Sequence, residues 1–287
     1  MWLKCFDRKE RDEQFLAMTW FGVPTASIAS TSSSRPVSGS TRPGTAAAAA
    51  HGTGVPGSLA GVEAVIVHVP PSDRMAFLDE RRALSVQRFD TVHSPAYDQH
   101  WGAITATHAD FVARLARRVP AGGQVLDAAC GTGKYWPALL GAGLQVMGID
   151  KSAGMLGQAT RKHPRVAVRV LALQDLAGTA DLPGRFDGLL CVDALECIAP
   201  EHWPGVAAGL AGAVRAGAPA YVTVELRSGP LPAASDPRQV PGEVIEGGGY
   251  HYYPSRPQAR RWLDEAGFAV ADQTDDGDYW HLLLTRI

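Results

Sequence analysis

The sequence has no large excess of charge of either sign. Its 287 residues include 27 Lys and Arg and 29 Asp and Glu, which leaves a formal net charge of -2 at pH 7. Such a balance provides no broad electrostatic attraction for nucleic acids or anionic membrane surfaces. Basic pairs such as Arg117–Arg118 and Arg260–Arg261 are predicted to lie on solvated helix faces. We therefore expect no nucleic-acid partner.

Cysteine is scarce and is not spaced for a metal or a disulfide. The four cysteines are Cys5, Cys130, Cys191 and Cys197; they form no C-x-x-C pair, and no His/Cys cluster has zinc-ligand spacing. We expect reduced thiols, a cytoplasmic protein and no bound metal. Cys130 is interpreted as a small turn residue rather than a nucleophile, because the sequence implies no partner histidine for it.

Long hydrophobic runs are also missing. No apolar stretch approaches the length of a transmembrane helix, and the apolar stretch at residues 15–23 is short and contains Thr19 and Gly22. Charges of both signs are interleaved in the first thirteen residues, unlike the start of a secretory signal. The sequence predicts neither export nor a membrane partner.

Residues 25–61 lack large apolar side chains almost entirely and consist mainly of Ser, Thr, Gly, Pro and Ala. Such a segment cannot bury enough surface to offset the entropy of ordering its backbone. We predict that residues 1–71 form a low-complexity, disordered N-terminal extension and that residues 72–287 form the folded domain.

What the folded part contains is a regular alternation of amphipathic and short apolar segments. Helices are expected at 72–89 (with Ser72 as N-cap), 107–119, 153–162, 202–215 and 258–266, and strands at 124–126, 145–149, 166–171, 186–192, 220–226, 268–271 and 280–285. This alternation predicts an α/β fold with a doubly wound, mostly parallel seven-stranded sheet. The last two strands, joined by a turn at 275–278, are expected to form a C-terminal antiparallel hairpin.

The most informative stretch follows the first of these strands. Residues 125–134 read as a buried strand, a tight turn with Gly131 and Gly133, and the start of a helix at Lys134. Glycine allows positive φ and close approach of a ligand to the backbone, and the first amide groups of a helix lack internal partners. Acids stand in the turn, at Asp127, and after the next strand, at Asp150. Dinucleotides, nucleoside triphosphates and S-adenosylmethionine all bind to turns of this kind.

Two of these ligands fit poorly. A dinucleotide turn requires a third small residue where this chain has Trp136. A triphosphate loop requires a first glycine, here replaced by Ala128, and a magnesium-binding hydroxyl, here replaced by Tyr135.

The motif Asp127-x-x-x-Gly131-x-Gly133, followed by Asp150 at the end of the second strand, resembles the class I S-adenosylmethionine-dependent methyltransferases. The resemblance extends over residues 88–287 and implies a Rossmann-like sheet and S-adenosylmethionine as cofactor. Asp127 and the glycines match the family's loop for the methionine moiety, and Asp150 matches its ribose acid, which would make charge-assisted hydrogen bonds to the diol. The cofactor-binding residues that we expect are Asp127, Ala128, Gly131, Gly133, Asp150, Lys151, Met155, Gln174, Asp175, Val192 and Asp193.

The acceptor side is predicted from the excursion at residues 226–254, which follows the fifth strand and therefore emerges at the ligand edge of the sheet. It combines three consecutive glycines with tyrosines and a histidine, as in a lid. His251 is the candidate general base. Tyr97, Trp101, Tyr250 and Tyr253 are the candidate substrate-binding residues.

A small-molecule acceptor is expected by elimination. The segment Val192–Leu195 lacks the Asn/Asp-Pro-Pro-Tyr/Phe motif of many amino-group methyltransferases, and no set of metal-binding acids is evident. An NAD(P)-dependent oxidoreductase and a non-catalytic cofactor-binding protein stay open as alternatives. The sequence does not indicate an oligomeric state.

Overall fold

The protein is described by a computed structural model that covers residues 70–227 and 229–287. The predicted N-terminal extension therefore lies almost wholly outside the described residues. A seven-stranded sheet forms the centre of the fold, in the order β3-β2-β1-β4-β5-β9-β8. Its strands are β1 (Gln124–Ala128), β2 (Gln145–Asp150), β3 (Ala167–Val170), β4 (Gly188–Cys191), β5 (Pro219–Glu225), β8 (Phe268–Asp275) and β9 (Tyr279–Arg286).

The pairing of these strands confirms the predicted fold class. Strands β1 to β5 pair in parallel, whereas β9 pairs antiparallel with both β5 and β8. From β1 to β3 each new strand is added on one side of the sheet, and from β4 onward strands are added on the other side of β1, so the strand order switches between β1 and β4. In open α/β sheets, ligands bind at the carboxyl ends of the strands beside such a switch point.

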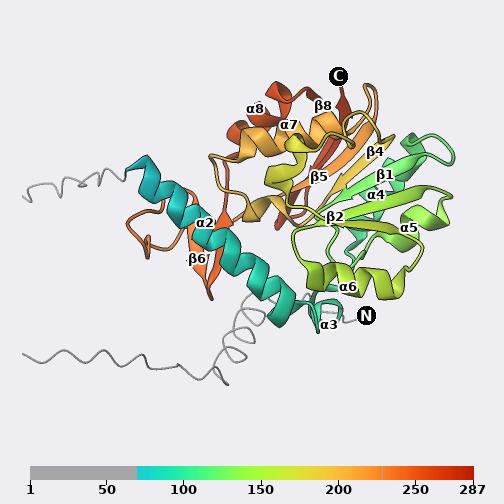
Figure 1. Ribbon diagram of the computed structural model, residues 1–287. Coiled ribbons are helices and arrows are strands. Elements are labelled where there is room, and N and C mark those ends of the chain that lie inside the picture. Colours follow the sequence, from blue (N-terminus) through green and yellow to red (C-terminus); the bar gives the residue numbers. More distant parts are fainter. Residues whose placement is uncertain (1–69, 228) are drawn as a thin grey trace, which may run out of the picture. The chain divides into compact units, whose positions relative to one another are not determined.

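Helices cover both faces of the sheet (Figure 1). Helices α4 (Ala106–Arg118), α5 (Trp136–Gly141) and α6 (Ala153–Lys162) pack on one face through residues such as Phe111 and Leu139. Helices α7 (Trp203–Ala213) and α8 (Arg256–Glu265) and the 3-10 helix η2 (Leu173–Gly178) pack on the other. Neighbouring residues of β1 belong to different cores: Val125 faces the first and Leu126 the second, as strand geometry requires.

The segment before the sheet consists of α2 (Pro71–Arg88), the π-helical turn η1 (Phe89–His93) and α3 (Tyr97–Trp101). The helix predicted at 72–89 is confirmed, but its N-cap is Pro70 rather than Ser72, and no side chain caps it. Proline at the first helical position replaces the cap, since its missing amide needs no partner there.

Two further elements differ from the predictions. The helix after the glycine turn begins at Trp136 instead of Lys134, because residues 131–135 are taken up by successive turns. The excursion at 226–254 contains an antiparallel hairpin, β6 (Glu243–Glu246) and β7 (Gly249–Tyr252), which the sequence analysis did not predict. The high glycine content masked the two short strands.

A buried ionic cluster joins α2 to this hairpin. Arg74 of α2 pairs with Glu201, which precedes α7, at 2.8 Å, and with Glu243 of β6 through both of its terminal nitrogens. The Tyr250 hydroxyl donates to the same Glu243 carboxylate. Burial opposes the charge of Arg74, but the hydrogen bonds to both glutamates outweigh it and raise the pKa of the guanidinium. We call Arg74, Glu201, Glu243 and Tyr250 the Arg74 cluster.

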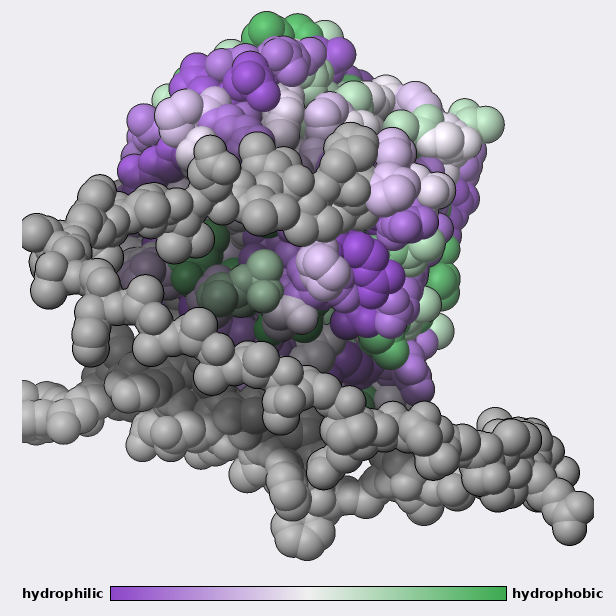
Figure 2. Space-filling model, turned by 90° about the vertical axis from the view of Figure 1, so that its left-hand side faces the viewer, coloured by the Kyte–Doolittle hydropathy of each residue, from purple (hydrophilic) through white to green (hydrophobic). Residues whose placement is uncertain are grey.

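The coloured surface in Figure 2 mixes hydrophilic and hydrophobic residues. The exposed large apolar side chains of the described part come from separate elements and include Val92, Ile104, Val170 and Leu231. Scattered exposed apolar residues are normal for a protein surface. Among the described helices, none is both long and apolar enough to cross a membrane.

Candidate active site

The glycine turn after β1 has the backbone geometry of a ligand cradle. Ala129, Gly131 and Gly133 all have positive φ, at 63°, 53° and 74°. A Cβ at Gly133 would lie 2.6 Å from the Trp136 ring, so both the space and the backbone require glycine there. A Cβ at Gly131 would meet the Met155 side chain at 3.2 Å. Met155 therefore lies directly beside the turn.

Asp127 lies beneath this turn, at the buried end of β1. Its carboxylate accepts a 2.8 Å hydrogen bond from the indole N–H of the fully buried Trp136. Burial raises the pKa of Asp127 to about 7; the Trp136 bond opposes this shift, and the nearby charge of Asp150 adds to it. In the sequence, Trp136 argued only against dinucleotide binding. In the structure, its indole N–H also holds the Asp127 carboxylate in place.

Asp150 connects the turn to the end of β2. One carboxylate oxygen accepts the Gly131 N–H at 2.9 Å, and the other accepts the Ser152 N–H at 2.8 Å. Burial nevertheless raises the pKa of Asp150 above its ordinary value. The carboxylate is held at the carboxyl edge of the sheet next to the glycine turn, where the predicted ribose acid should be.

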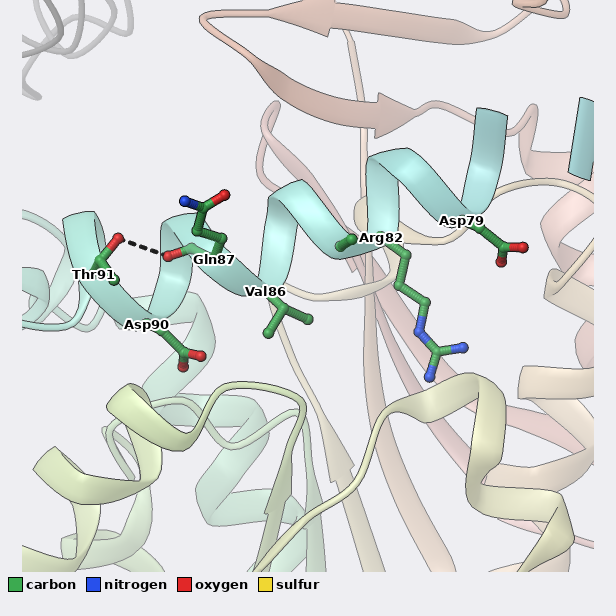
Figure 3. Close-up of a pocket in the computed structure, with 7 residues that line it drawn as sticks. Asp79, Arg82, Val86, Gln87, Asp90 and Thr91 are labelled. Carbon is green, nitrogen blue, oxygen red and sulfur yellow. Dashed lines mark hydrogen bonds between the residues drawn. The ribbon is translucent and has the colours of Figure 1, made fainter. Parts of the chain in front are cut away.

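Helix α2 and η1 carry an open groove along one side (Figure 3). The groove is lined by Asp79, Arg82, Ala83, Val86, Gln87, Asp90 and Thr91. Arg82 forms an ion pair with the exposed Asp175 in η2, where half-buried Gln174 precedes it. The Lys151 ammonium donates to the Ser85 hydroxyl at 2.6 Å. These contacts place Lys151 and Asp175 beside α2, and Gln174 precedes Asp175 in η2.

Asp90 of η1 makes a second connection to the residues that follow β2. The Asp90 carboxylate accepts hydrogen bonds from the Ser152 hydroxyl at 2.6 Å and from the Gly154 N–H at 2.9 Å. The segment before the sheet therefore contacts the residues that directly follow Asp150, namely Lys151, Ser152 and Gly154.

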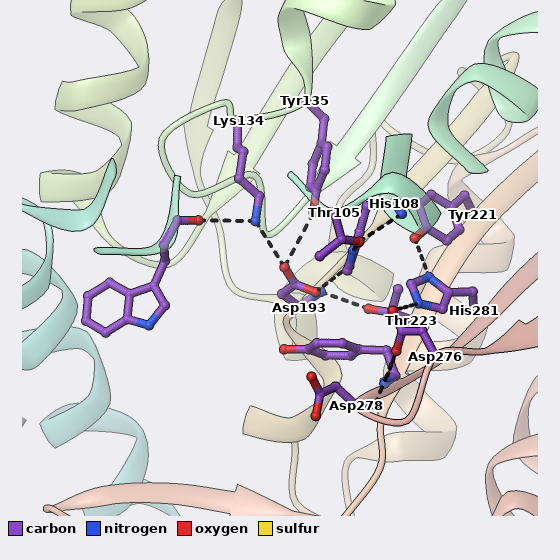
Figure 4. Close-up of polar contacts among 12 residues, drawn as sticks. Thr105, His108, Lys134, Tyr135, Asp193, Tyr221, Thr223, Asp276, Asp278 and His281 are labelled. Carbon is purple, nitrogen blue, oxygen red and sulfur yellow. Dashed lines mark hydrogen bonds and ion pairs between the residues drawn. The ribbon is translucent and has the colours of Figure 1, made fainter. Parts of the chain in front are cut away.

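Asp193, directly after the buried Val192 at the tip of β4, organises a polar network (Figure 4). It has a left-handed backbone, with φ of 52°, and its N–H donates to the Thr223 hydroxyl at 2.9 Å. Its carboxylate contacts His108 Nε2 at 3.2 Å, Lys134 Nζ at 3.3 Å and the Tyr135 hydroxyl at 3.4 Å. Burial opposes ionisation, but His108 and Lys134 outweigh it and lower the pKa of Asp193. This acid is thus an ionised, fully partnered group.

Behind Asp193 the network continues through two histidines. The imidazole nitrogens and carboxylate of His108, His281 and Asp276 lie within 4.8 Å of one another, close enough for a metal site. Each histidine nitrogen already has a protein partner, however: Thr105 and Asp193 for His108, and Tyr221 and Asp276 for His281. Hydrogen bonding accounts for this arrangement without a metal ion.

Two of the predicted substrate-binding residues, Tyr97 and Trp101, come from α3. The Tyr97 and Trp101 rings of α3 pack together, with centroids 5.4 Å apart, and the Trp101 carbonyl accepts a bond from Lys134. Burial and the nearby carboxylates of Asp193, Glu196 and Asp150 raise the pKa of Tyr97. Its phenol therefore feels the negative charges of these three carboxylates.

The residues of the β6–β7 hairpin point in two directions. His251 Nδ1 lies 4.0 Å from Glu225 Oε2, at the end of β5, and the His251 and Tyr253 rings stack with centroids 6.1 Å apart. Tyr250 points the other way, into the Arg74 cluster and against Phe77. Only His251 and Tyr253 are thus placed beside the sheet edge.

Sequence reasoning missed Glu196, in the 3-10 helix η3 (Leu195–Cys197) after β4. This side chain is buried, and its Oε2 atom has no hydrogen-bond partner among the described residues. Burial, then the carboxylates of Glu225 and Asp193, raise the pKa of Glu196 well above its ordinary value. Its place three residues after Asp193 was visible in the sequence, but its lack of a partner was not.

Comparison with known proteins supports the predicted class. A family model described as a methyltransferase domain matches residues 97–273. The chain belongs to this methyltransferase family. The resemblance inferred from Asp127, Gly131, Gly133 and Asp150 is thereby confirmed at the level of the family.

Individual relatives agree with this assignment. A ubiquinone biosynthesis O-methyltransferase of Xanthomonas axonopodis pv. citri is 29% identical over 168 residues, which cover 55% of this chain and 67% of that protein. Other curated relatives are matched over only 34% to 40% of their own length.

Two solved structures share the fold. The 1,6-didemethyltoxoflavin-N1-methyltransferase of Burkholderia thailandensis, with bound 1,6-didemethyltoxoflavin and S-adenosylhomocysteine, has a TM-score of 0.57 and 19% identity, and covers 77% of this chain and 92% of that one. The magnesium protoporphyrin IX methyltransferase of Synechocystis PCC 6803, with bound S-adenosylmethionine, has a TM-score of 0.52 and 18% identity, and covers 72% and 97%. The predicted Rossmann-like architecture is confirmed.

Proposed function

We propose that the protein transfers a methyl group from S-adenosylmethionine to a hydroxyl group of a small-molecule acceptor. The observation that carries this proposal is the meeting of the left-handed glycine turn with Asp150 at the switch point of the sheet. The turn exposes backbone for close approach of the cofactor, and the acid is fixed by the Gly131 and Ser152 amides.

The predicted cofactor residues fit the parts of S-adenosylmethionine in order along this edge. The methionine moiety would lie at Gly131 and Gly133 over Asp127 and Ala128, where a cationic amino group would favour the ionised form of Asp127. The ribose diol would face Asp150. The adenine would lie in the groove under α2, near Lys151, Met155, Gln174 and Asp175, and Val192 and Asp193 would flank the methyl group.

The relatives support this assignment of cofactor and acceptor. Several curated relatives are named ubiquinone biosynthesis O-methyltransferases, which favours a hydroxyl acceptor of low molecular weight. The two structural neighbours hold S-adenosylmethionine or S-adenosylhomocysteine, and one also holds a small heterocyclic compound. The cytoplasmic location expected from the sequence is kept as part of this proposal.

A thermal-shift experiment tests the cofactor assignment. S-adenosylhomocysteine at 100 times its Kd should stabilise the protein by about 2.7 kcal/mol. Asp150→Asn should lose most of this ligand-induced shift, measured against its own ligand-free melting temperature. Asp181→Asn, which alters an exposed ion pair with Arg169, is the matched control and should retain the shift. Stabilisation by NAD(P)H in place of S-adenosylhomocysteine would refute the proposal in favour of an oxidoreductase.

A further inference from the structure

One oxygen of the Glu196 carboxyl group has no donor, although its own backbone N–H bonds to the carboxyl group and lowers its pKa slightly against the effect of burial. Asp193 contacts His108, Lys134 and Tyr135, and Asp150 accepts two backbone amides. Glu196 Oε2 is buried and accepts no hydrogen bond from the described residues. A buried carboxyl oxygen without a donor costs stability, so this arrangement has a stability penalty that a ligand could relieve.

Several titratable groups face or lie close to Glu196. They are Glu225 from β5, His251 of β7 beside Glu225, Tyr279 from β9, Tyr97 from α3, Lys151 from the β2–α6 loop, and Asp193 and Cys197 on either side of it in the chain. Lys151 is the one cation in this set of described groups that favours ionisation of Glu196, and its ammonium already donates to Ser85. Among the described groups that most affect Glu196, the one positive charge is therefore shared with Ser85.

On the basis of the proposed function, we infer that Glu196 is the catalytic base of the transfer and that it ionises when the positively charged cofactor binds. The sulfonium provides a further positive charge. A charge near a buried carboxyl shifts its protonation by direct Coulomb attraction, which is strong where water is excluded.

The chemical step then balances without a further reactant. The acceptor oxygen forms a bond to the methyl carbon while the sulfur–methyl bond breaks, and the electron pair of that bond stays on sulfur. The hydroxyl proton passes to the Glu196 carboxylate. Sulfonium and carboxylate charges disappear together, so the buried site has the same net charge before and after transfer, which avoids an uncompensated buried charge.

The other candidates are less suited to this role. Asp193 is held ionised by His108 and Lys134, so it binds a proton weakly at neutral pH. His251 has a side chain that is 34% exposed, and its Nδ1 lies 4.0 Å from Glu225 Oε2. We therefore assign His251 a place between the Glu196–Glu225 pair and solvent, where it would help the proton to leave.

The test compares S-adenosylmethionine with S-adenosylhomocysteine, which differ at the sulfonium but share the amino acid, ribose and adenine parts. Calorimetry in buffers of different ionisation enthalpy counts the protons released on binding. The ratio of the two affinities should rise with pH, approaching about tenfold per pH unit below the Glu196 pKa, because only the sulfonium is linked to this ionisation. Effects of pH on Asp127 and Asp150 cancel in the ratio.

Substitutions assign the effect to one residue. Glu196→Gln should abolish the pH dependence of the ratio, whereas Glu265→Gln, at an exposed position of α8, should retain it. Glu225→Gln should move the transition to lower pH, because it removes a neighbouring negative charge, and His251→Ala should leave the proton count unchanged. With 3,4-dihydroxybenzoate as the probe acceptor, Glu196→Gln should lower kcat at least about 100-fold.

The outcomes separate the inference from the function on which it rests. If neither compound binds, the proposed function fails. If both bind with a ratio that is independent of pH in the parent protein, or if Glu196→Gln keeps the pH dependence, the role of Glu196 is overturned while the cofactor assignment stands.

Discussion

The buried carboxyl groups of Glu243, in β6, and Glu196, in η3, differ in the hydrogen-bond donors that the chain provides for them. Glu243 is enclosed in the Arg74 cluster, where the guanidinium, the Tyr250 hydroxyl and the Val240 N–H all donate to it. Glu196 is also buried, but its Oε2 has no donor among the described residues. A buried carboxylate whose donors come from the chain holds secondary-structure elements together. A buried carboxyl oxygen without a donor is available to a ligand.

The largest effect on this comparison is expected for Arg74→Met, which leaves the buried Glu243 carboxylate without its cationic partner. Removing one partner of a buried ion pair costs about 3–5 kcal/mol. We expect a loss of unfolding free energy of this size in urea denaturation. Arg169→Met, which breaks the exposed pair with Asp181, should cost much less; equal losses would show that burial of the Arg74 cluster contributes nothing.

Glu196→Gln should have the opposite effect and increase the free energy of unfolding. The pKa of Glu196 is raised in the folded state, so its favourable contribution is complete below its ordinary value of 4.5 and is lost as pH rises through the folded-state pKa. The variant avoids that loss. We expect a gain of about 1–3 kcal/mol at pH 8, which shrinks toward pH 4.5, in thermal melts across this range. A variant less stable than the parent at pH 8 would contradict the unpartnered state.

Tyr250→Phe removes one donor from Glu243 but leaves Arg74 in place. We expect a loss of about 1 kcal/mol, typical of a single hydrogen bond. Because the Tyr250 hydroxyl points into the Arg74 cluster, methyl transfer should be little affected, unlike in Tyr253→Phe beside His251. A large rise in KM for the acceptor in Tyr250→Phe would instead restore its predicted substrate-binding role.

The smallest effect is expected for Arg82→Ala, which removes the ion pair to Asp175 over the groove. Both side chains are substantially exposed, so the stability change should stay below about 1 kcal/mol and decrease further in high salt. A loss as large as that of Arg74→Met would mean that solvent exposure does not distinguish the ion pairs made by these two arginines of α2.

The features that could be predicted from the sequence are those encoded within a short stretch. The positive φ at Gly131 and Gly133 and the placement of Asp150 beside them follow from a motif and the next strand, and the fold follows from alternating periodicity. The hydrogen-bond partners of a buried side chain could not be predicted from the sequence. Glu196 faces groups from β5 and β9, which are far away in the chain, so its lack of a donor depends on packing that no local pattern records.

The β6–β7 hairpin shows the same limit in its secondary structure. Its two strands have four residues each and are joined through Gly247 and Gly248, which have positive φ. Local composition favours a loop there. Glu243 and Tyr250 become strand residues because the Arg74 cluster and α2 cover one face of the hairpin, and tertiary packing overrides local preference.

The left-handed backbone of Asp193 determines how mutagenesis at this position can be interpreted. A φ of 52° is uncommon outside glycine, and Asn adopts it about as readily as Asp, whereas Ala adopts it at a greater energetic cost, as Ala129 of the glycine turn does. Asp193→Asn therefore isolates the carboxylate charge, while Asp193→Ala combines the loss of charge with a conformational cost. Any library that samples this position will be depleted of β-branched residues for conformational reasons alone, whatever the acceptor requires.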